Sequence, residues 1–185
     1  MSDRNKAKLL SGGHKGTEAE FGSCAARWGL REVTFSFEGH QMEWSQDVRV
    51  LSPEELAKGD ISMEIVSQRM GRNYTNIQQI RRVVQSLFHM VKESYQVFAV
   101  GFIQADNTVQ GGTGWGVELA RFFNRPVTVF DQDKGQWFSW NGSDWIPDVP
   151  LIPERPFAGT GTRNLSDGGR RAIQELFERS FGAAK

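Results

Sequence analysis

The sequence has few of the features that mark several large classes of protein. Cys24 is its only cysteine, so no internal disulfide can form and nothing points to an oxidising compartment. Lys and Arg total 22, as do Asp and Glu, so the chain lacks the net basic charge that general nucleic-acid binding or a polybasic membrane anchor requires. The longest apolar run, 97–103, is far too short to span a bilayer. We therefore expect no general nucleic-acid binding and no membrane association.

Two further absences bear on location and on metal binding. Residues 1–6 lack the apolar stretch of a signal peptide, which favours a cytoplasmic protein. His40 and His89 have no partner at the spacing of a metal-binding motif, since the sequence contains neither His-x-x-x-His nor paired cysteines. We expect no metal site, and we interpret His89 as a surface or boundary residue of a helix and Cys24 as a core residue.

The sequence does contain an alternation of short apolar runs and helical patterns, which is typical of a parallel sheet covered by helices. A length of 185 residues suits one domain, so we predict a single domain over residues 1–185. Its fold class is predicted to be α/β, a Rossmann-like three-layer sandwich with a mainly parallel sheet of about four to six strands. The predicted strands lie at 8–10, 33–37, 48–51, 95–102 and 127–130.

Three helices have clear local signals. Thr17 with Glu20 predicts a capping box at the start of one helix. Ser52-Pro53, followed by two acidic residues, predicts the start of another. The strongest helical pattern begins after Asn76, with one apolar face that comprises Ile77, Ile80, Val84, Leu87, Phe88 and Val91.

Two segments differ from the rest of the chain. In residues 136–146, aromatic residues flank Asn141-Gly142, a strong signal for a small, tight antiparallel hairpin. Its aromatic side chains could stack on a base or ribose, or they could form a protein interface, where such residues are enriched. Residues 59–75 are harder to assign, and we interpret residues 41–75 as a possible insert that could serve subunit pairing.

Three glycine-rich segments are the most informative motifs, because each lies where an apolar run gives way to a helical pattern. Glycine lets backbone amides approach a ligand, and a helix N-terminus adds partial positive charge. Since such turns gather at the carboxyl edge of a parallel sheet, we predict one site for a phosphate-bearing molecule. The candidate binding residues are Ser11, Gly12, Gly13, His14, Lys15, Gly16, Thr17, Gly111, Gly112, Thr113, Gly114, Trp115, Gly159, Thr160, Gly161, Thr162 and Arg163.

Alternatives remain open for these segments. Each could be an ordinary strand-to-helix turn, and none has the spacing of a Walker A loop or of the Gly-x-Gly-x-x-Gly dinucleotide fingerprint. Lys15 could meet a phosphate and His14 could donate to one or stack on a base, or both could be solvated loop side chains.

The segments resemble motifs of the SLOG superfamily. Residues 111–118 resemble the Gly-Gly-x-Gly-Thr-x-x-Glu signature of the LOG phosphoribohydrolases, with Trp115 where that family has threonine. Residues 11–17 are similar to the Ser-Gly-Gly-x-x-Gly motif of DprA, and residues 157–163 resemble the strand and turn that open these proteins. Here that opening element comes last, as in the circularly permuted YpsA-like branch, some members of which are labelled "putative molybdenum carrier".

The resemblance implies a Rossmann-like fold that binds nucleotides or nucleotide-derived ligands. In LOG enzymes the glutamate of the signature helps to cleave an N-glycosidic bond of a nucleoside monophosphate, and by position it maps to Glu118. The assisting arginine maps best to Arg163, with Arg69 and Arg72 behind it. Two other roles stay open: Glu118 could only complement the start of a helix, and Arg163 could be a plain phosphate clamp.

Three functions of a ligand site therefore compete, and a scaffold in an oligomer is a fourth possibility. The first is binding, for sensing or sequestering, of a nucleotide-derived small molecule such as an ADP-ribose derivative or a signalling nucleotide, with no required cofactor. The second is a LOG-like phosphoribohydrolase that uses Glu118 and Arg163. The third is a carrier of a molybdenum cofactor or an oxyanion. Related superfamily members often pair, so a homodimer or a larger homo-oligomer is a further expectation.

Overall fold

The structure is a computed structural model that describes residues 2–74 and 78–184. These form one eight-stranded sheet in the order β3-β2-β1-β8-β4-β5-β6-β7. Neighbours from β3 to β5 pair in parallel, whereas β6 and β7 add an antiparallel hairpin at one edge. The strands are β1 (Lys8–Ser11), β2 (Arg31–Phe37), β3 (Val48–Leu51), β4 (Gln96–Gly101), β5 (Val127–Asp131), β6 (Gln136–Trp140), β7 (Trp145–Pro147) and β8 (Pro156–Gly161).

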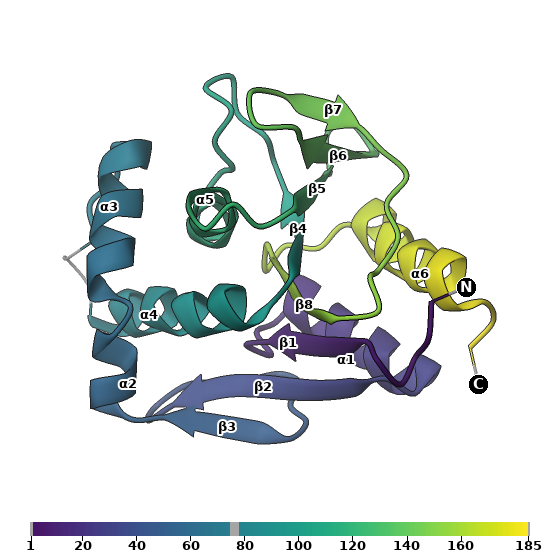
Figure 1. The fold of residues 1–185 in the computed structure, drawn as a ribbon, viewed down its shortest axis with the longest axis horizontal. Coiled ribbons are helices and arrows are strands. Elements are labelled where there is room, and N and C mark those ends of the chain that lie inside the picture. The colour runs from purple at the N-terminus through teal and green to yellow at the C-terminus, as the bar shows by residue number, and fades with distance from the viewer. Residues whose placement is uncertain (1, 75–77, 185) are drawn as a thin grey trace.

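Helices cover both faces of the sheet, so the predicted three-layer α/β fold with a mainly parallel sheet is confirmed. Figure 1 shows α4 and α5 on one side of the sheet and α1 and α6 on the other. Helices α2 and α3 lie beyond α4 at the outer end of its layer. The helices are α1 (Thr17–Trp28), α2 (Pro53–Ala57), α3 (Asp60–Met70), α4 (Gln78–Glu93), α5 (Thr113–Phe122) and α6 (Asp167–Phe181).

Two apolar clusters form the core, one on each face of the sheet. Successive side chains of β4 alternate between them: Val97 and Ala99 join the cluster beneath α4 and α5, and Phe98 and Val100 join the one beneath α1 and α6. This alternation follows from the two-residue repeat of a strand. A central parallel strand is buried on both faces, which explains why its sequence is almost continuously apolar.

The sheet is larger than predicted, since about four to six strands were expected and it has eight. The five strands predicted above correspond to β1 to β5, and the sheet gains β8 and the two strands of the hairpin. The hairpin itself is confirmed, but Asn141–Asp144 form its connection in place of a tighter turn. The Asn141 side chain accepts hydrogen bonds from the amides of Ser143 and Asp144, which stabilises this longer turn.

Of the two helix starts predicted from capping residues, one is confirmed and the other has a different structure. The Ser52 cap is present, and Glu55 completes its capping box. The capping box predicted from Thr17 and Glu20 is wrong, because Gly16 precedes the helix and no side chain caps it. The Thr17 hydroxyl instead donates to the carbonyl of Thr162 at 2.8 Å.

The apolar face predicted for α4 is largely confirmed, with Val84, Leu87, Phe88 and Val91 buried. Ile80 is instead 53% exposed, and Ile77 lies outside the described residues. The surface or boundary assignment of His89 is wrong, since its ring is buried and its Nε2 lies 2.8 Å from the carbonyl oxygen of Glu55. Cys24 is buried in the core, as predicted. Of the described helices, none combines the length and apolar character needed to cross a membrane.

Candidate functional site

A cavity of about 730 Å³ lies beyond the carboxyl ends of β4 and β8. The segments that follow β1, β4 and β8 line it together with one side of α4 and the start of α5. An adjoining cavity of about 630 Å³ shares His14, Gln79, Val83 and Arg163 with it. The carboxyl edge of the sheet therefore carries an extended hollow large enough for a nucleotide-sized molecule.

The three glycine-rich segments meet at this hollow. The candidate residues that line the main cavity are His14, Gly111, Gly112, Thr113, Trp115, Thr160, Gly161, Thr162 and Arg163. Lys15 lines the adjoining cavity. Each of the three segments thus contributes residues to one region of the surface, as expected for turns at the same edge of a parallel sheet.

The remaining candidates do not line either of these cavities. They are Ser11, Gly12, Gly13, Gly16, Thr17, Gly114, Gly159 and Glu118. Several of the glycines have a packing role. A Cβ on Gly159 would lie 2.6 Å from the Phe21 ring, and one on Gly114 would lie 2.1 Å from the carbonyl oxygen of Val109. At these positions glycine allows neighbouring elements to pack closely.

Many loop amides already have internal acceptors. The amide of Gly13 donates to Ser11 Oγ, that of His14 to Glu18, and that of Thr17 to the carbonyl of Thr162. The start of α5 is partly occupied in the same way, since the amides of Gly114 and Trp115 donate to the carbonyls of Gly111 and Gly112. Gly112 and Thr113 belong to that start and line the cavity. Of the amides predicted to bind a ligand, those of Gly112 and Thr113 at the start of α5 therefore remain the main candidates.

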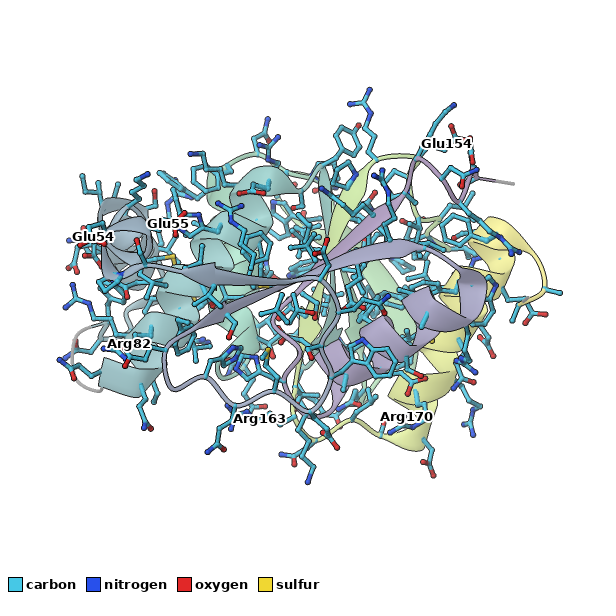
Figure 2. The ribbon with its side chains drawn as sticks, turned by 90° about the horizontal axis from the view of Figure 1, so that it is seen from below. Glu54, Glu55, Arg82, Glu154, Arg163 and Arg170 are labelled. Atoms are coloured by element: carbon cyan, nitrogen blue, oxygen red, sulfur yellow. The ribbon has the colours of Figure 1, made fainter. Side chains whose placement is uncertain are left out.

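Two cations supply positive charge at the hollow. Arg163 lines both cavities and Lys15 lines the adjoining one. Across residues 2–74 and 78–184, no carboxylate lies within ion-pair distance of either side chain. Figure 2 shows Arg163 and Arg82, another residue of the adjoining cavity, toward the lower edge of the molecule. The positive charges of Lys15 and Arg163 are therefore available to an anionic ligand.

Glu18 is a buried carboxylate in the cavity wall that the sequence analysis missed. Its Oε2 accepts hydrogen bonds from the His14 amide (3.0 Å) and pairs with His14 Nδ1 (2.7 Å), and its Oε1 accepts one from the Thr160 hydroxyl (2.9 Å). Burial alone would raise the pKa of Glu18, but these bonds and the His14 ring together hold it below its ordinary value of 4.5. Glu18 therefore occupies, as a carboxylate, the place at the start of α1 where we expected a ligand anion.

His40 extends this arrangement into the adjoining cavity. Its Nε2 lies 2.9 Å from Nε2 of His14, its Nδ1 lies 3.2 Å from Ser36 Oγ, and its ring stacks on Phe37. Burial, with smaller contributions from the charges of His14 and Arg163, lowers the pKa of His40 to about 4. His40 is therefore neutral at physiological pH. No local pattern joins residues 14 and 40, whereas the i,i+4 spacing of His14 and Glu18 was a signal that could have been read.

Glu118 lies away from the hollow. Its carboxylate pairs with Arg121 at 3.0 Å, and the Arg121 guanidinium stacks 3.8 Å from the Trp140 ring centre of the hairpin. Of the two other arginines considered, Arg69 stacks on Phe122, and Arg72 donates to the carbonyls of Gly111 and Val109. The residues proposed for glycoside cleavage are thus separated, with only Arg163 in the cavity wall.

Among the residues that the structure describes, no three His, Cys, Asp or Glu side chains lie together in a group that could hold a metal ion. The closest approach to one is the row of Glu18, His14 and His40, whose polar atoms bond one another.

Comparisons with known proteins concern the fold. No protein-family model matches the chain, and no curated protein matches it. Among solved structures, it is similar to a protein of Syntrophus aciditrophicus SB named "putative molybdenum carrier protein", with a TM-score of 0.57 and 12% sequence identity. The match covers 96% of each chain. The chain therefore shares its overall fold with that protein along almost its full length.

Proposed function

We propose that this chain binds a small anionic molecule of nucleotide size at the carboxyl edge of its sheet. The observation that carries the proposal is that all three glycine-rich segments line one hollow beside Lys15 and Arg163, two cations that have no carboxylate partner among the residues that the structure describes. The start of α5 adds the amides of Gly112 and Thr113 and the positive end of its dipole. The main cavity of about 730 Å³ falls within the usual size range of small-molecule sites.

A nucleotide-derived ligand suits this hollow for a second reason. Trp115 lines the main cavity, and the small exposed part of its otherwise buried ring offers an aromatic contact for a base. The proposal extends to membership of the circularly permuted YpsA-like branch of the SLOG superfamily, which rests on the three motifs and on their order. Phosphates would lie toward Arg163 and the start of α5, and the base would lie toward Trp115.

Carriage of a molybdenum cofactor or of an oxyanion is the second candidate. The name of the structural neighbour favours it, and the same donors would serve, since guanidinium groups and helix amides bind a tetrahedral oxyanion as they bind phosphate. Cleavage of an N-glycosidic bond by Glu118 receives no comparable support, because Glu118 is paired with Arg121 outside the cavity.

Thermal shift followed by calorimetry tests the proposal and separates its two forms. The ligands are AMP, ADP-ribose, sodium molybdate and inorganic phosphate, and elemental analysis of the purified protein reports any bound molybdenum. A ligand at a hundredfold over its Kd should stabilise the fold by roughly 2.7 kcal/mol. Preference for AMP or ADP-ribose supports the nucleotide form, and preference for molybdate or co-purified molybdenum supports the second candidate.

Arginine variants locate the binding site. Arg163→Ala should weaken binding by about tenfold or more, because it removes a charge-assisted contact. Arg171→Ala removes an exposed arginine of α6 that lines neither cavity, so binding should be unchanged. Equal affinity of both variants and the native chain would place the ligand elsewhere, and absence of binding by all four ligands would overturn the proposal.

A further inference from the structure

A row of hydrogen bonds crosses the wall between the two cavities. It runs from the Thr160 hydroxyl to Glu18, from Glu18 to His14, from His14 to His40, and ends at Ser36. Glu18 lines the main cavity, His40 lines the adjoining one, and His14 lines both. A ligand in either cavity would therefore lie against this row of hydrogen-bonded side chains, in which the number of bound protons can change.

The distances restrict where protons can reside. Glu18 is ionised and can only accept, so His14 Nδ1 carries a hydrogen toward it. The Nε2 atoms of His14 and His40 lie 2.9 Å apart, which requires one hydrogen between them and leaves no room for two.

Three arrangements satisfy these restrictions, and the one in which His40 is the imidazolium is disfavoured because burial lowers the pKa of His40. Two arrangements remain. In the first, both rings are neutral and His40 donates to His14. In the second, His14 is an imidazolium that donates to a neutral His40, and Nδ1 of His40 donates to Ser36. The two arrangements differ by a single proton. Burial of His40 lowers its pKa to about 4, so the additional proton belongs to His14.

The charges around His14 favour a change in this proton count when an anion binds. Glu18 of α1 faces one side of its ring, and the neutral His40 faces the other. Arg163 approaches from the segment after β8, and Lys15 precedes α1. The adjoining cavity adds three more charged groups, which are Glu38, Glu43 and Arg82. A ligand anion beside His14 adds negative charge and so favours the imidazolium form.

We propose that the Glu18–His14–His40 row takes up one proton when an anionic ligand enters the hollow, so that His14 becomes a cation facing that ligand. This inference rests on the proposed function. It identifies the ligand class as molecules with a phosphate or other oxyanion beside His14, and it makes their binding stronger as pH falls.

Calorimetry in two buffers measures the proton directly. AMP and sodium molybdate are titrated separately into the full chain at about pH 7, in PIPES and in Tris, which differ in ionisation enthalpy. The observed binding enthalpy should differ between the buffers by an amount that corresponds to uptake of up to about one proton per ligand. The Kd should rise with pH, by up to about tenfold per pH unit.

Matched histidine variants test whether His14 is the residue that takes up the proton when the ligand binds. His14→Gln should abolish the buffer dependence, whereas His89→Gln, which changes the remaining histidine of the chain at a site outside both cavities, should retain it. If His14→Gln does not fold, nitrogen-detected NMR of the native chain replaces it. Addition of AMP should then convert the His14 ring from one bound proton to two.

The outcomes separate this inference from the proposed function. Binding of AMP or molybdate with the same enthalpy in both buffers would overturn the proton uptake and leave the proposed function intact. Buffer dependence that persists in His14→Gln, or an NMR signal of His14 that keeps its protonation state, would also overturn it. Absence of binding by any of the ligands would refute the proposed function and this inference with it.

Discussion

The hydroxyl of Thr160, at the end of β8, donates to the carboxylate of Glu18, a residue 142 positions earlier in the first turn of α1. The bond joins one glycine-rich segment to the residue that directly follows another, at the wall of the main cavity. It also supplies one of the hydrogen bonds that keep a buried carboxylate ionised.

Replacement of this hydroxyl should destabilise the fold. Thr160→Val keeps the shape of the side chain but removes the donor, and a buried charged acceptor that loses a partner retains its desolvation cost. We expect the free energy of unfolding to fall by about 1–3 kcal/mol, measured by urea denaturation. Thr160→Ser keeps the hydroxyl and should lose less. A Thr160→Val variant as stable as the native chain would contradict this account of the bond.

Glu18 should make stability depend on pH in a defined direction. Its folded-state pKa is lower than its unfolded value, so its stabilisation is present above the ordinary value of 4.5 and is lost as pH falls below it. Glu18→Gln removes this titration and places an amide donor against the donors of His14. The native chain should therefore be more stable than the variant near neutral pH, with a difference that shrinks below about pH 4.5.

Urea denaturation across this pH range measures the difference. Glu64→Gln, on the exposed side of α3, controls for the removal of one carboxylate from the chain. A difference between the native chain and Glu18→Gln that stays constant from neutral to acidic pH would show that Glu18 does not titrate as described.

Cys24 should be chemically inert in the folded chain. Burial raises the pKa of its thiol to about 12, and the thiolate is the reactive form. Ellman's reagent should therefore react slowly at neutral pH and rapidly after urea is added. Since Cys24 is the only cysteine, the reaction reports on this position alone. Rapid reaction of the folded chain would show that α1 opens or that the thiol is accessible.

Two glycines of the candidate set should respond differently to an added methyl group. A Cβ on Gly159 would lie 2.6 Å from the Phe21 ring inside the core, so Gly159→Ala should cost about 1–3 kcal/mol of unfolding free energy. A Cβ on Gly112 would meet no atom within 4 Å, so Gly112→Ala should leave stability nearly unchanged. Thermal unfolding compares them, and equal melting temperatures would contradict the packing role of Gly159.

The sequence was sufficient to predict the layers of the fold and the region of the site. The apolar run of β4 and the turn-rich segments carry local signals that depend on nearest neighbours in the chain. The division of the glycines into cavity-lining and packing positions could not be predicted. It depends on what each Cβ would meet, such as Phe21 against Gly159, and these neighbours come from distant segments.

Two features of the site depend on tertiary structure in the same way. His40 reaches His14 because the segment after β2 folds back on the turn between β1 and α1. There the amides of Glu43 and Trp44 donate to the carbonyl of Gly13. The direction of Glu118 is set by Arg121 and by the hairpin ring beneath it. The contacts of His14 with His40 and of Arg121 with Trp140 have no counterpart in local spacing, so nothing in the motifs indicated His40. The Glu118–Arg121 pair itself has the i,i+3 spacing of neighbours on one helix face, a local signal that could have been read.

The position of β8 has a consequence for how the chain folds during synthesis. This strand lies between β1 and β4, so it separates a group formed by β1–β3 from one formed by β4–β7. Until residue 161 leaves the ribosome, these two groups have no strand to join them, and each exposes an unpaired inner edge. A nascent chain in this state would be open to strand pairing with other molecules, which makes its protection by chaperones important until β8 is inserted.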